Sequence, residues 1–295
     1  MGRQNRMSRR LIPLLGGFLL WAVEATAHGG LVQNIDLSAS PDLERAVIRV
    51  AQQYLGTTRR PESFDHVNGK VSANFDRSAG VAVLVDVLDY GRSGRVRVFG
   101  FKDERRLAKG AASRISPTEA VTRARKVFER DIPPEMRAEL SPLSLRFLSG
   151  TYVAKWIRTV GGVPILGNEA FEVGVNGVTG EVVYWELGLF DFPSHVIDLS
   201  LKVSADEARR RAVEAVRERA LPHVLLTAVP VTLVVHGREP YYGAVFAASD
   251  SRDRLYVTVH GRGGRVQTGP RNEEFEEVAE ALRPGVARTF PGLTE

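Results

Sequence analysis

Residues 171–182 read FEVGVNGVTGEV: apolar and polar side chains alternate, the chain turns through glycines, and a second strand begins. Alternation followed by a glycine-bearing turn is the pattern of a β-hairpin. The stretch aligns without a gap to LYVTVHGRGGRV at residues 255–266, and a similar pattern with one extra turn residue lies at residues 85–96. This recurrence predicts a chain built from copies of one supersecondary unit.

A helix start precedes each of the two later hairpins. Ser116 and Glu119 form an S-x-x-E capping box, and Ser204 and Glu207 form another 88 residues later. In such a box the serine side chain caps the first turn of the helix. Pro117 suits that turn, because its missing N–H would have no partner there. An earlier helix is expected near Pro41, where apolar residues recur at helical spacing, namely Leu43, Ala46, Val47, Val50, Ala51 and Tyr54.

We therefore expect an α+β fold of two to three repeated units, each with one helix packed on a small antiparallel β-sheet. The units span residues 38–108, 115–190 and 203–270, and residues 271–295 form a C-terminal helix and tail. Units of this size are marginally stable by themselves, so they should pack against one another. The C-terminal helix should dock on the last unit through one apolar side, which carries Phe275, Val278, Ala279 and Leu282.

The first 27 residues have the three parts of a secretory signal. Four arginines lead, an apolar run follows from residue 11 to 23, and Ala25 and Ala27 supply the small residues of a cleavage site before His28. The run is too short for a good membrane span, which needs about 20 apolar residues. We expect residues 1–27 to be a cleaved signal peptide and the protein to be secreted, periplasmic or part of the cell envelope, without a stable membrane span.

Charge and cysteine content exclude several classes of protein. The chain has 40 basic and 35 acidic residues, and removal of the leader takes away four arginines and one glutamate, which leaves 36 and 34. A nucleic-acid binder should show a large positive excess, so we expect no nucleic-acid partner. There is no cysteine, which excludes disulfides and thiolate zinc sites.

None of the catalytic sequence templates is present. The chain has neither H-E-x-x-H, the zinc-peptidase pattern, nor G-x-S-x-G, the nucleophile pattern. His195 with Asp198 and His236 with Glu239 could each offer two metal ligands, but a site usually needs three that converge. We therefore expect no catalytic residue, no metal and no cofactor. Sequence cannot select a carboxylate pair from 35 acidic residues, so an acidic hydrolase site stays open.

The order of these motifs resembles a known family. An S-x-x-E-A helix start, then strands, then V-x-V-N-x-x-T-G-E-V at residues 173–182, is similar to the PepSY domain. Residues 156–168, WIRTVGGVPILGN, resemble the hairpin of YcdB/YcdC-type repeats and of thermolysin-family propeptide domains. The resemblance is closest over residues 115–190, weaker over 203–270 and weakest over 38–108.

The resemblance implies a PepSY/cystatin-like fold and a function without catalysis. Such domains are thought to inhibit or chaperone proteases, or to bind other proteins outside the cytoplasm. Because no catalytic domain follows, we expect the protein to act in trans on an extracytoplasmic protein, with a peptidase as one candidate partner. Two alternatives remain: a secreted hydrolase with an unrecognised acidic site, and a structural component of the cell envelope.

Two features are candidates for partner binding. The first is an apolar hairpin tip and the second is a set of strand aromatics; the residues are Val163, Pro164, Ile165, Leu166, Trp156 and Trp185. Contiguous exposed apolar residues mark interaction sites, so the tip could meet a partner. The other interpretation is that the tip folds back on a neighbouring unit and that the aromatics fill the core under the second helix.

Overall fold

The structure is a computed structural model. It describes residues 41–67, 70–86, 97–107, 109–167, 169–188, 193–218, 230–247, 254–269 and 272–282. The predicted signal peptide, with Ala25 and Ala27, lies outside the described residues, and so does most of the hairpin predicted at residues 85–96.

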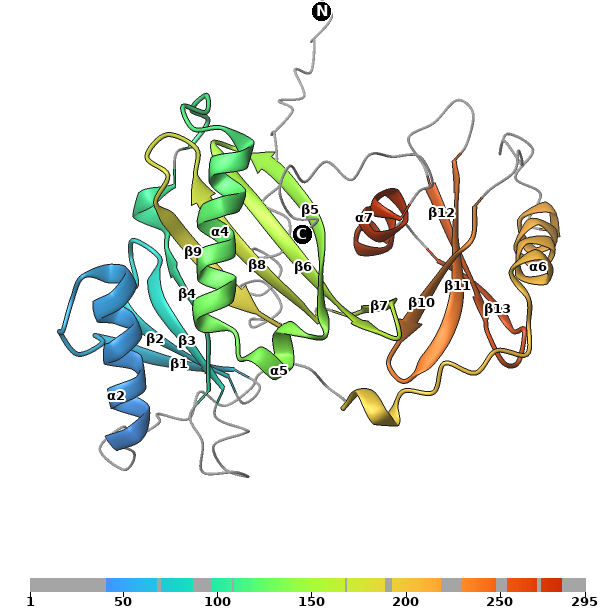
Figure 1. Ribbon diagram of the computed structural model, residues 1–295, viewed down its shortest axis with the longest axis horizontal. Helices are drawn as coiled ribbons and strands as arrows, with labels where there is room; N and C mark the ends of the chain where they lie inside the picture. Colours follow the sequence, from blue (N-terminus) through green and yellow to red (C-terminus); the bar gives the residue numbers. More distant parts are fainter. Residues whose placement is uncertain are drawn as a thin grey trace, which may run out of the picture.

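Thirteen strands form one hydrogen-bonded sheet (Figure 1). The strand order is β1-β2-β3-β4-β9-β8-β6-β7-β10-β11-β12-β13, and β5 pairs with β6 beside this path. The strands are β1 (Ser63–Val67), β2 (Lys70–Asp76), β3 (Val81–Asp86), β4 (Arg97–Asp103), β5 (Leu140–Leu148), β6 (Thr151–Val160), β7 (Val163–Leu166), β8 (Ala170–Asn176), β9 (Val182–Leu187), β10 (Thr232–His236), β11 (Glu239–Ala247), β12 (Arg254–His260) and β13 (Val266–Gly269).

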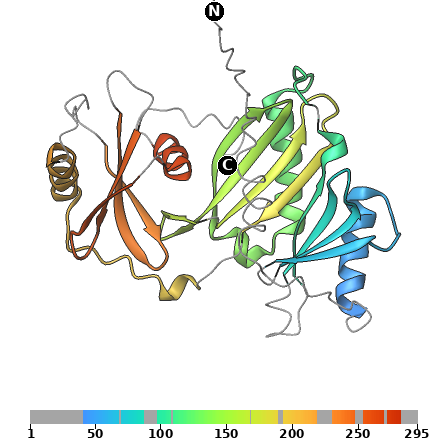
Figure 2. The ribbon, with the colours of Figure 1, turned by 180° about the vertical axis from the view of Figure 1, so that it is seen from behind.

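Helices lie against this sheet at several places (Figures 1 and 2). The helix α4 packs on β6, β8 and β9, α6 packs on β11, β12 and β13, and α2 packs on β3 and β4. The helical segments are α2 (Pro41–Val50), η2 (Ala51–Leu55), η3 (Glu104–Arg106), α4 (Pro117–Asp131), α5 (Pro134–Arg137), η4 (Ser194–Val196), α6 (Ala205–Glu218) and α7 (Glu273–Ala281). Within the described ranges, no helix is both long and apolar enough to cross a membrane.

The predicted fold of repeated units, each with a helix on its own small sheet, is wrong. The strands of the expected units join edge to edge: β4 pairs with β9 from Gly100 to Lys102, and β7 pairs with β10. The β7–β10 pair is parallel, whereas the other strand pairs in the described part of the chain are antiparallel. Small sheets that stayed separate would leave unpaired backbone N–H and C=O groups at each edge, and these joins pair three residues of β4 and two of β10.

The predicted helix starts are confirmed. The Ser116 hydroxyl accepts the N–H of Glu119 at 3.1 Å, and the Ser204 hydroxyl accepts the N–H of Glu207 at 3.2 Å. These contacts satisfy one otherwise orphaned amide at each helix N-terminus. The apolar stripe of the first helix is confirmed as well, because Val47, Ala51 and Tyr54 lie in the main core.

The main core lies between the sheet and the helices α2 and α4. The ring of Tyr54 stacks on Phe101 at 4.1 Å, and Phe128 of α4 stacks on Trp156 at 4.9 Å. Apolar contact of this kind is the main source of stability in a fold without disulfides. Further clusters lie under α6 and around β7.

Strand β7 is the seam between the central and the C-terminal strands. It pairs with β6 at Pro164 and Val163, and with β10 at Ile165 and Leu166. Ile165 has no solvent exposure. The helix α7 covers the same seam, since Phe275 and other apolar side chains cluster with Leu166 and with residues of both β6 and β10. α7 thus docks on the central strands as well as on the C-terminal ones.

Leu166→Ala and Leu148→Ala form a matched pair that tests the seam. Leu166 is 5% exposed and Leu148 is 46% exposed. We expect Leu166→Ala to lower the free energy of unfolding by about 2–5 kcal/mol, because it leaves a cavity, and Leu148→Ala to change it by less than about 0.5 kcal/mol. Urea unfolding followed by circular dichroism measures both. If Leu166→Ala lowered the free energy of unfolding by no more than about 0.5 kcal/mol, as expected for Leu148→Ala, a stabilising role of the seam would be contradicted.

Candidate functional site

Strand β5 is a terminal strand of the sheet. Among the described strands it pairs only with β6, whose other side is occupied by β8 from Thr151 to Ile157. A terminal strand presents N–H and C=O groups to which another extended segment can bind. The strands β1 and β13 also end the sheet, so the surrounding side chains decide which edge is suited to binding.

A two-residue turn joins β5 to β6. Ser149, at φ 48°, and Gly150, at φ 88°, both have left-handed backbone conformation. Leu148 pairs with Thr151 across them. Two left-handed central residues define the type I′ turn, whose twist matches that of the flanking strands. Serine is an uncommon residue in this conformation, so the turn has a local energetic cost.

This turn determines which backbone groups of β5 face outward. The pair that flanks a two-residue turn is hydrogen-bonded, and bonded and non-bonded pairs then alternate along the ladder. The register is uninterrupted between Ser144 and Leu148. The N–H and C=O groups of Leu145 and Phe147 therefore point away from β6. They can offer four hydrogen bonds to an added strand.

Exposed apolar side chains flank these outward groups. Phe147 is 43% exposed and Leu148 is 46% exposed, whereas no large apolar side chain of β1 or β13 is this exposed among those the structure describes. Phe147 lies on the α4 side of the sheet, where its ring contacts Tyr152 at 4.7 Å. Because side chains alternate along a strand, Leu148 lies on the other side. The edge thus carries one exposed large apolar side chain on each of its faces.

The open edge is short and has a boundary at each end. At its start stands Pro142, which has no N–H to donate, next to a register shift between Pro142 and Ser144. Proline and bulges are the usual devices that stop uncontrolled strand addition. At its end the N–H of Gly110 already donates to the Ser149 carbonyl at 3.3 Å. Five residues, 144–148, remain between these limits, or roughly 17 Å of strand.

The β8–β9 turn supports the tip of this hairpin. The N–H of Gly177 donates to the Gly150 carbonyl at 2.8 Å. A Cβ on Gly177 would lie 2.8 Å from that same oxygen and 2.8 Å from the ring of Phe147. Only glycine therefore lets the turn approach the tip this closely, and the approach holds the Phe147 ring in place.

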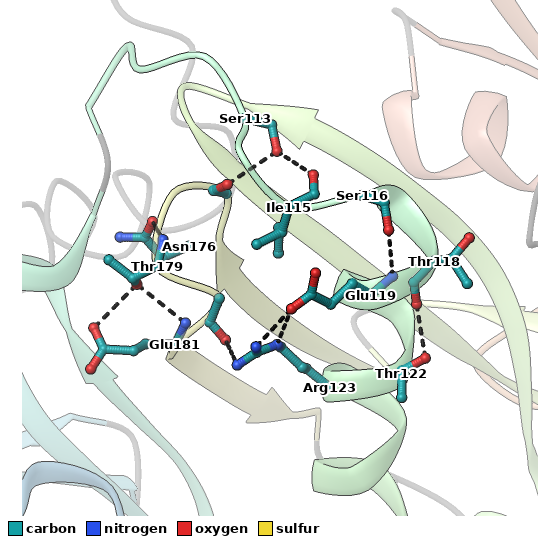
Figure 3. Close-up of polar contacts among 12 residues, drawn as sticks. Ser113, Ile115, Ser116, Thr118, Glu119, Thr122, Arg123, Asn176, Thr179 and Glu181 are labelled. Carbon is teal, nitrogen blue, oxygen red and sulfur yellow. Dashed lines mark hydrogen bonds and ion pairs between the residues drawn. The ribbon is translucent and has the colours of Figure 1, made fainter.

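The β8–β9 turn is itself held by polar contacts (Figure 3). The Ser113 hydroxyl lies 3.1 Å from the Gly177 carbonyl and 2.7 Å from that of Ile115. The backbone N–H groups of Arg114 and Ile115 also donate to Gly177. Inside the turn, the Asn176 side chain accepts the N–H groups of residues 178 and 179 at 2.7 and 3.0 Å. The turn is thus fixed by side chains from both sides.

An arginine clamp joins this turn to α4 (Figure 3). Arg123 donates to the Gly180 carbonyl at 2.9 Å and to the Glu119 carboxylate at 2.7 Å. Matching contacts occur around α6: Arg211 donates to the Gly264 carbonyl at 2.9 Å and to Glu207 at 2.6 Å. In both places the capping glutamate orients the arginine, and the arginine binds a turn glycine.

The correspondence between the surroundings of α4 and those of α6 extends to backbone hydrogen bonds and to a buried tyrosine. Tyr152 donates to the Ile115 carbonyl at 3.3 Å, as Tyr242 does to that of Val203 at 3.0 Å. The N–H of Gly261 donates to the carbonyl of residue 240 at 2.8 Å, as Gly177 does to Gly150. The strands β10, β11 and β12 therefore occupy the same places in their contacts as β5, β6 and β8. β10 has β7 on its free side.

Charge is uneven at the tip. Residues 105–107, 109–118, 144–151 and 174–180 meet there and contain five basic and no acidic residues. Arg105 and Arg106 are paired with buried Asp103. Burial raises the pKa of the Asp103 carboxyl, but the hydrogen bond from Arg105 and the two guanidinium charges outweigh burial and leave that pKa lowered. The remaining basic residues are Lys109, Arg114 and Arg146.

Two other charged clusters hold the seam rather than form an open site. Arg158, which is 1% exposed, pairs with Glu139 at 2.6 Å and with buried Glu169. Lys155 lies 3.3 Å from both Glu172 and Glu277 of α7. Burial lowers the pKa of Lys155, but the surrounding glutamates outweigh burial and raise it. Ion pairs this enclosed position elements, and removal of one partner is costly.

The chain's other polar features do not converge on a reaction centre. His260 is bonded to Glu239 at 2.9 Å and accepts the Gly263 N–H at 2.8 Å, so its place matches that of Asn176. A cavity of about 180 Å³ beside Leu55 and Phe75 has Arg59, Arg60 and Arg105 at its border. Among the residues that the structure describes, no three histidine or acidic side chains cluster as metal ligands would.

The structure places the sequence-predicted binding residues in the interior. Pro164, Ile165 and Leu166 are buried at the seam, and Val163 is half-buried there. Trp156 is 2% exposed under α4. Trp185 is 3% exposed and its ring lies 6.0 Å from that of Phe171. Their binding to a partner stays a prediction, and in this structure their side chains contact the chain's own core.

Sequence reasoning missed Phe147 and Leu148. The sequence does contain a signal for them. Apolar and polar residues alternate through Leu145, Arg146 and Phe147, just before Ser149-Gly150, a dipeptide that is typical of turns. The alternation does not distinguish an edge strand from an inner one, so the exposure of these two residues could not be read from it.

No protein-family model matches the chain, and no curated protein matches its sequence. The chain is similar to the solved C-terminal domain of Bacillus megaterium YpeB, with 12% identity over 81% of this chain and 100% of that one, at a TM-score of 0.42. It is also similar to a Clostridium difficile 630 protein described as a "putative lipoprotein", with 13% identity over 50% of this chain and 92% of that one, at a TM-score of 0.17. TM-scores this low do not establish a shared fold.

Substitution of Ser149 tests the turn that fixes the edge. Asparagine tolerates the left-handed conformation and valine does not. We expect Ser149→Asn to raise the free energy of unfolding by about 0.5 kcal/mol and Ser149→Val to lower it by about 1–2 kcal/mol. Thermal unfolding of the two variants beside the unmodified protein measures this. A stability order of valine above asparagine would contradict a type I′ turn.

Proposed function

We propose that this protein is an exported binding protein that acts without catalysis and pairs the edge of β5 with an extended segment of an extracytoplasmic protein. The observation that carries the proposal is the open edge of β5. It combines the outward N–H and C=O groups of Leu145 and Phe147 with exposed apolar side chains on both faces. Strand addition obtains affinity from such main-chain groups and specificity from the flanking side chains.

The C-terminal strands of the same chain support this mode of binding. β10 has the place relative to β11 that β5 has relative to β6, and β10 accepts β7 as an added strand at Val235 and His236. An edge of this kind therefore pairs with an extended segment inside the molecule. We propose that β5 does the same with a segment from another protein.

Export and the absence of catalysis are parts of the proposal. The predicted signal peptide at residues 1–27 supports a partner outside the cytoplasm. A peptidase is the partner class that the resemblance of residues 115–190 to thermolysin-family propeptide domains implies. Assay of the purified protein against peptide, ester and glycoside substrates checks the absence of catalysis, and turnover of any of them would contradict it.

Two substitutions at Phe147 separate the backbone from the side chain. Phe147→Ala removes the ring and keeps the N–H, whereas Phe147→Pro removes both. Proline at an outward-facing position leaves the β6 ladder intact. We expect capture of a partner from the envelope fraction to weaken with Phe147→Ala and to be lost with Phe147→Pro, while circular dichroism shows both variants folded.

A photo-crosslinker locates the contact. We expect p-benzoylphenylalanine at position 148 to crosslink the captured partner, and the same group at Glu129, which is exposed on α4, to leave it unlinked. Mass spectrometry of the crosslinked peptide identifies the partner and its segment. Recovery of the same partner with Phe147→Pro, or crosslinks at position 129 alone, would refute the edge as the binding site.

A further inference from the structure

The charge of the surface around the β5 edge restricts what can bind there. The loop of residues 109–115 lies against the tip, since Gly110 donates to Ser149 and Arg114 donates to Gly177. This loop brings the charges of Lys109 and Arg114 to the end of the edge, and both side chains are exposed. Arg146 adds a third charge within the edge itself.

Few acidic groups offset these charges. Arg146 has one carboxylate partner, Glu277, at 3.3 Å, and Glu277 is shared with Lys155 and with the Ser144 hydroxyl. Neither Lys109 nor Arg114 has an ion-pair partner among the residues that the structure describes. Unpaired charges at the border of a binding surface select for partners of opposite sign.

The edge also limits the shape of its occupant. Pro142 and Gly110 bound the open stretch at residues 144–148, so an added strand has about five residues in register. Side chains of that strand alternate between the two faces. One set lies beside Leu145 and Phe147, and the other beside Arg146 and Leu148.

From this placement we infer that the occupant of the β5 edge is a short extended segment in which apolar residues alternate with acidic ones. The apolar residues pack beside Phe147 and the acidic ones face Arg146, while Lys109 and Arg114 add positive charge at the end of the edge. A second copy of β5 is a poor occupant, because antiparallel pairing centred on residue 146 places Arg146 opposite itself, and like charges directly opposite are destabilising. This inference rests on the proposed function and names the class of its partner.

Three synthetic peptides test the inference directly. Each is a fluorescently labelled decapeptide in which five valines alternate with five glutamates, five lysines or five glutamines. We expect fluorescence anisotropy at low salt to show binding of the glutamate peptide about tenfold tighter than that of the lysine peptide, with the glutamine peptide between them. The preference should shrink at high salt, because these charges are exposed.

Charge-reversal variants assign the preference to the loop. Lys109→Glu combined with Arg114→Glu should remove or invert the preference for glutamate. The matched control is the double variant Arg59→Glu and Arg60→Glu, which also reverses two neighbouring exposed charges but lies in the loop between η2 and β1; it should leave the preference unchanged. Phe147→Pro should abolish binding of all three peptides.

The outcomes separate this inference from the proposed function. Equal binding of the three peptides, all sensitive to Phe147→Pro, would refute the charge selection and leave strand addition standing. Binding that survives Phe147→Pro would refute the edge itself. Failure of all three peptides to bind would refute the alternating acidic segment, and the crosslinking at position 148 would then decide the proposed function alone.

Discussion

The whole structure depends on the backbone hydrogen bonds of strand β6. β8 pairs with β6 on one side over residues 151–157, β5 pairs with the same residues on the other side, and the last two residues pair with β7. Backbone groups buried without partners would be costly, so these three neighbours are obligatory. Through β8 and β9 the ladder reaches the first four strands, and through β7 it reaches the last four. A single ten-residue strand thus connects the entire sheet.

Sheet edges explain why this fold differs from the separate units expected from the sequence. Certain local contacts recur around α4 and α6: a serine caps each helix, and an arginine of each helix binds the carbonyl of a turn glycine. Yet local pattern specifies only what lies within a hairpin. The pairing of Phe101 with Trp185 and of Val235 with Ile165 joins strands that lie far apart in sequence, and no period in the sequence encodes such pairings.

The candidate site shows the same division between local and long-range information. Ser116, Ser204 and the glycines of the β8–β9 turn could be interpreted from sequence, because their roles depend on near neighbours. The apolar tip at Val163–Leu166 could be identified but not placed, because an apolar strand has the same sequence pattern whether it is covered by β10 or exposed to solvent. Phe147 and Leu148 were missed for the converse reason: their exposure results from which strands did not pair with β5.

The contrast between β5 and β10 connects fold and function. Both edges are held by an equivalent turn, since Gly177 bonds to Gly150 as Gly261 bonds to residue 240. β10 receives β7, whose Ile165 is buried by the contact. β5 receives no strand from the described part of the chain and instead exposes Phe147. An exposed aromatic side chain beside outward-facing N–H groups favours uncontrolled pairing with other chains, so such an edge is a liability for a folded protein. Pro142 and Gly110 limit the open stretch to five residues, 144–148, so a strand added at this edge would pair over that length only.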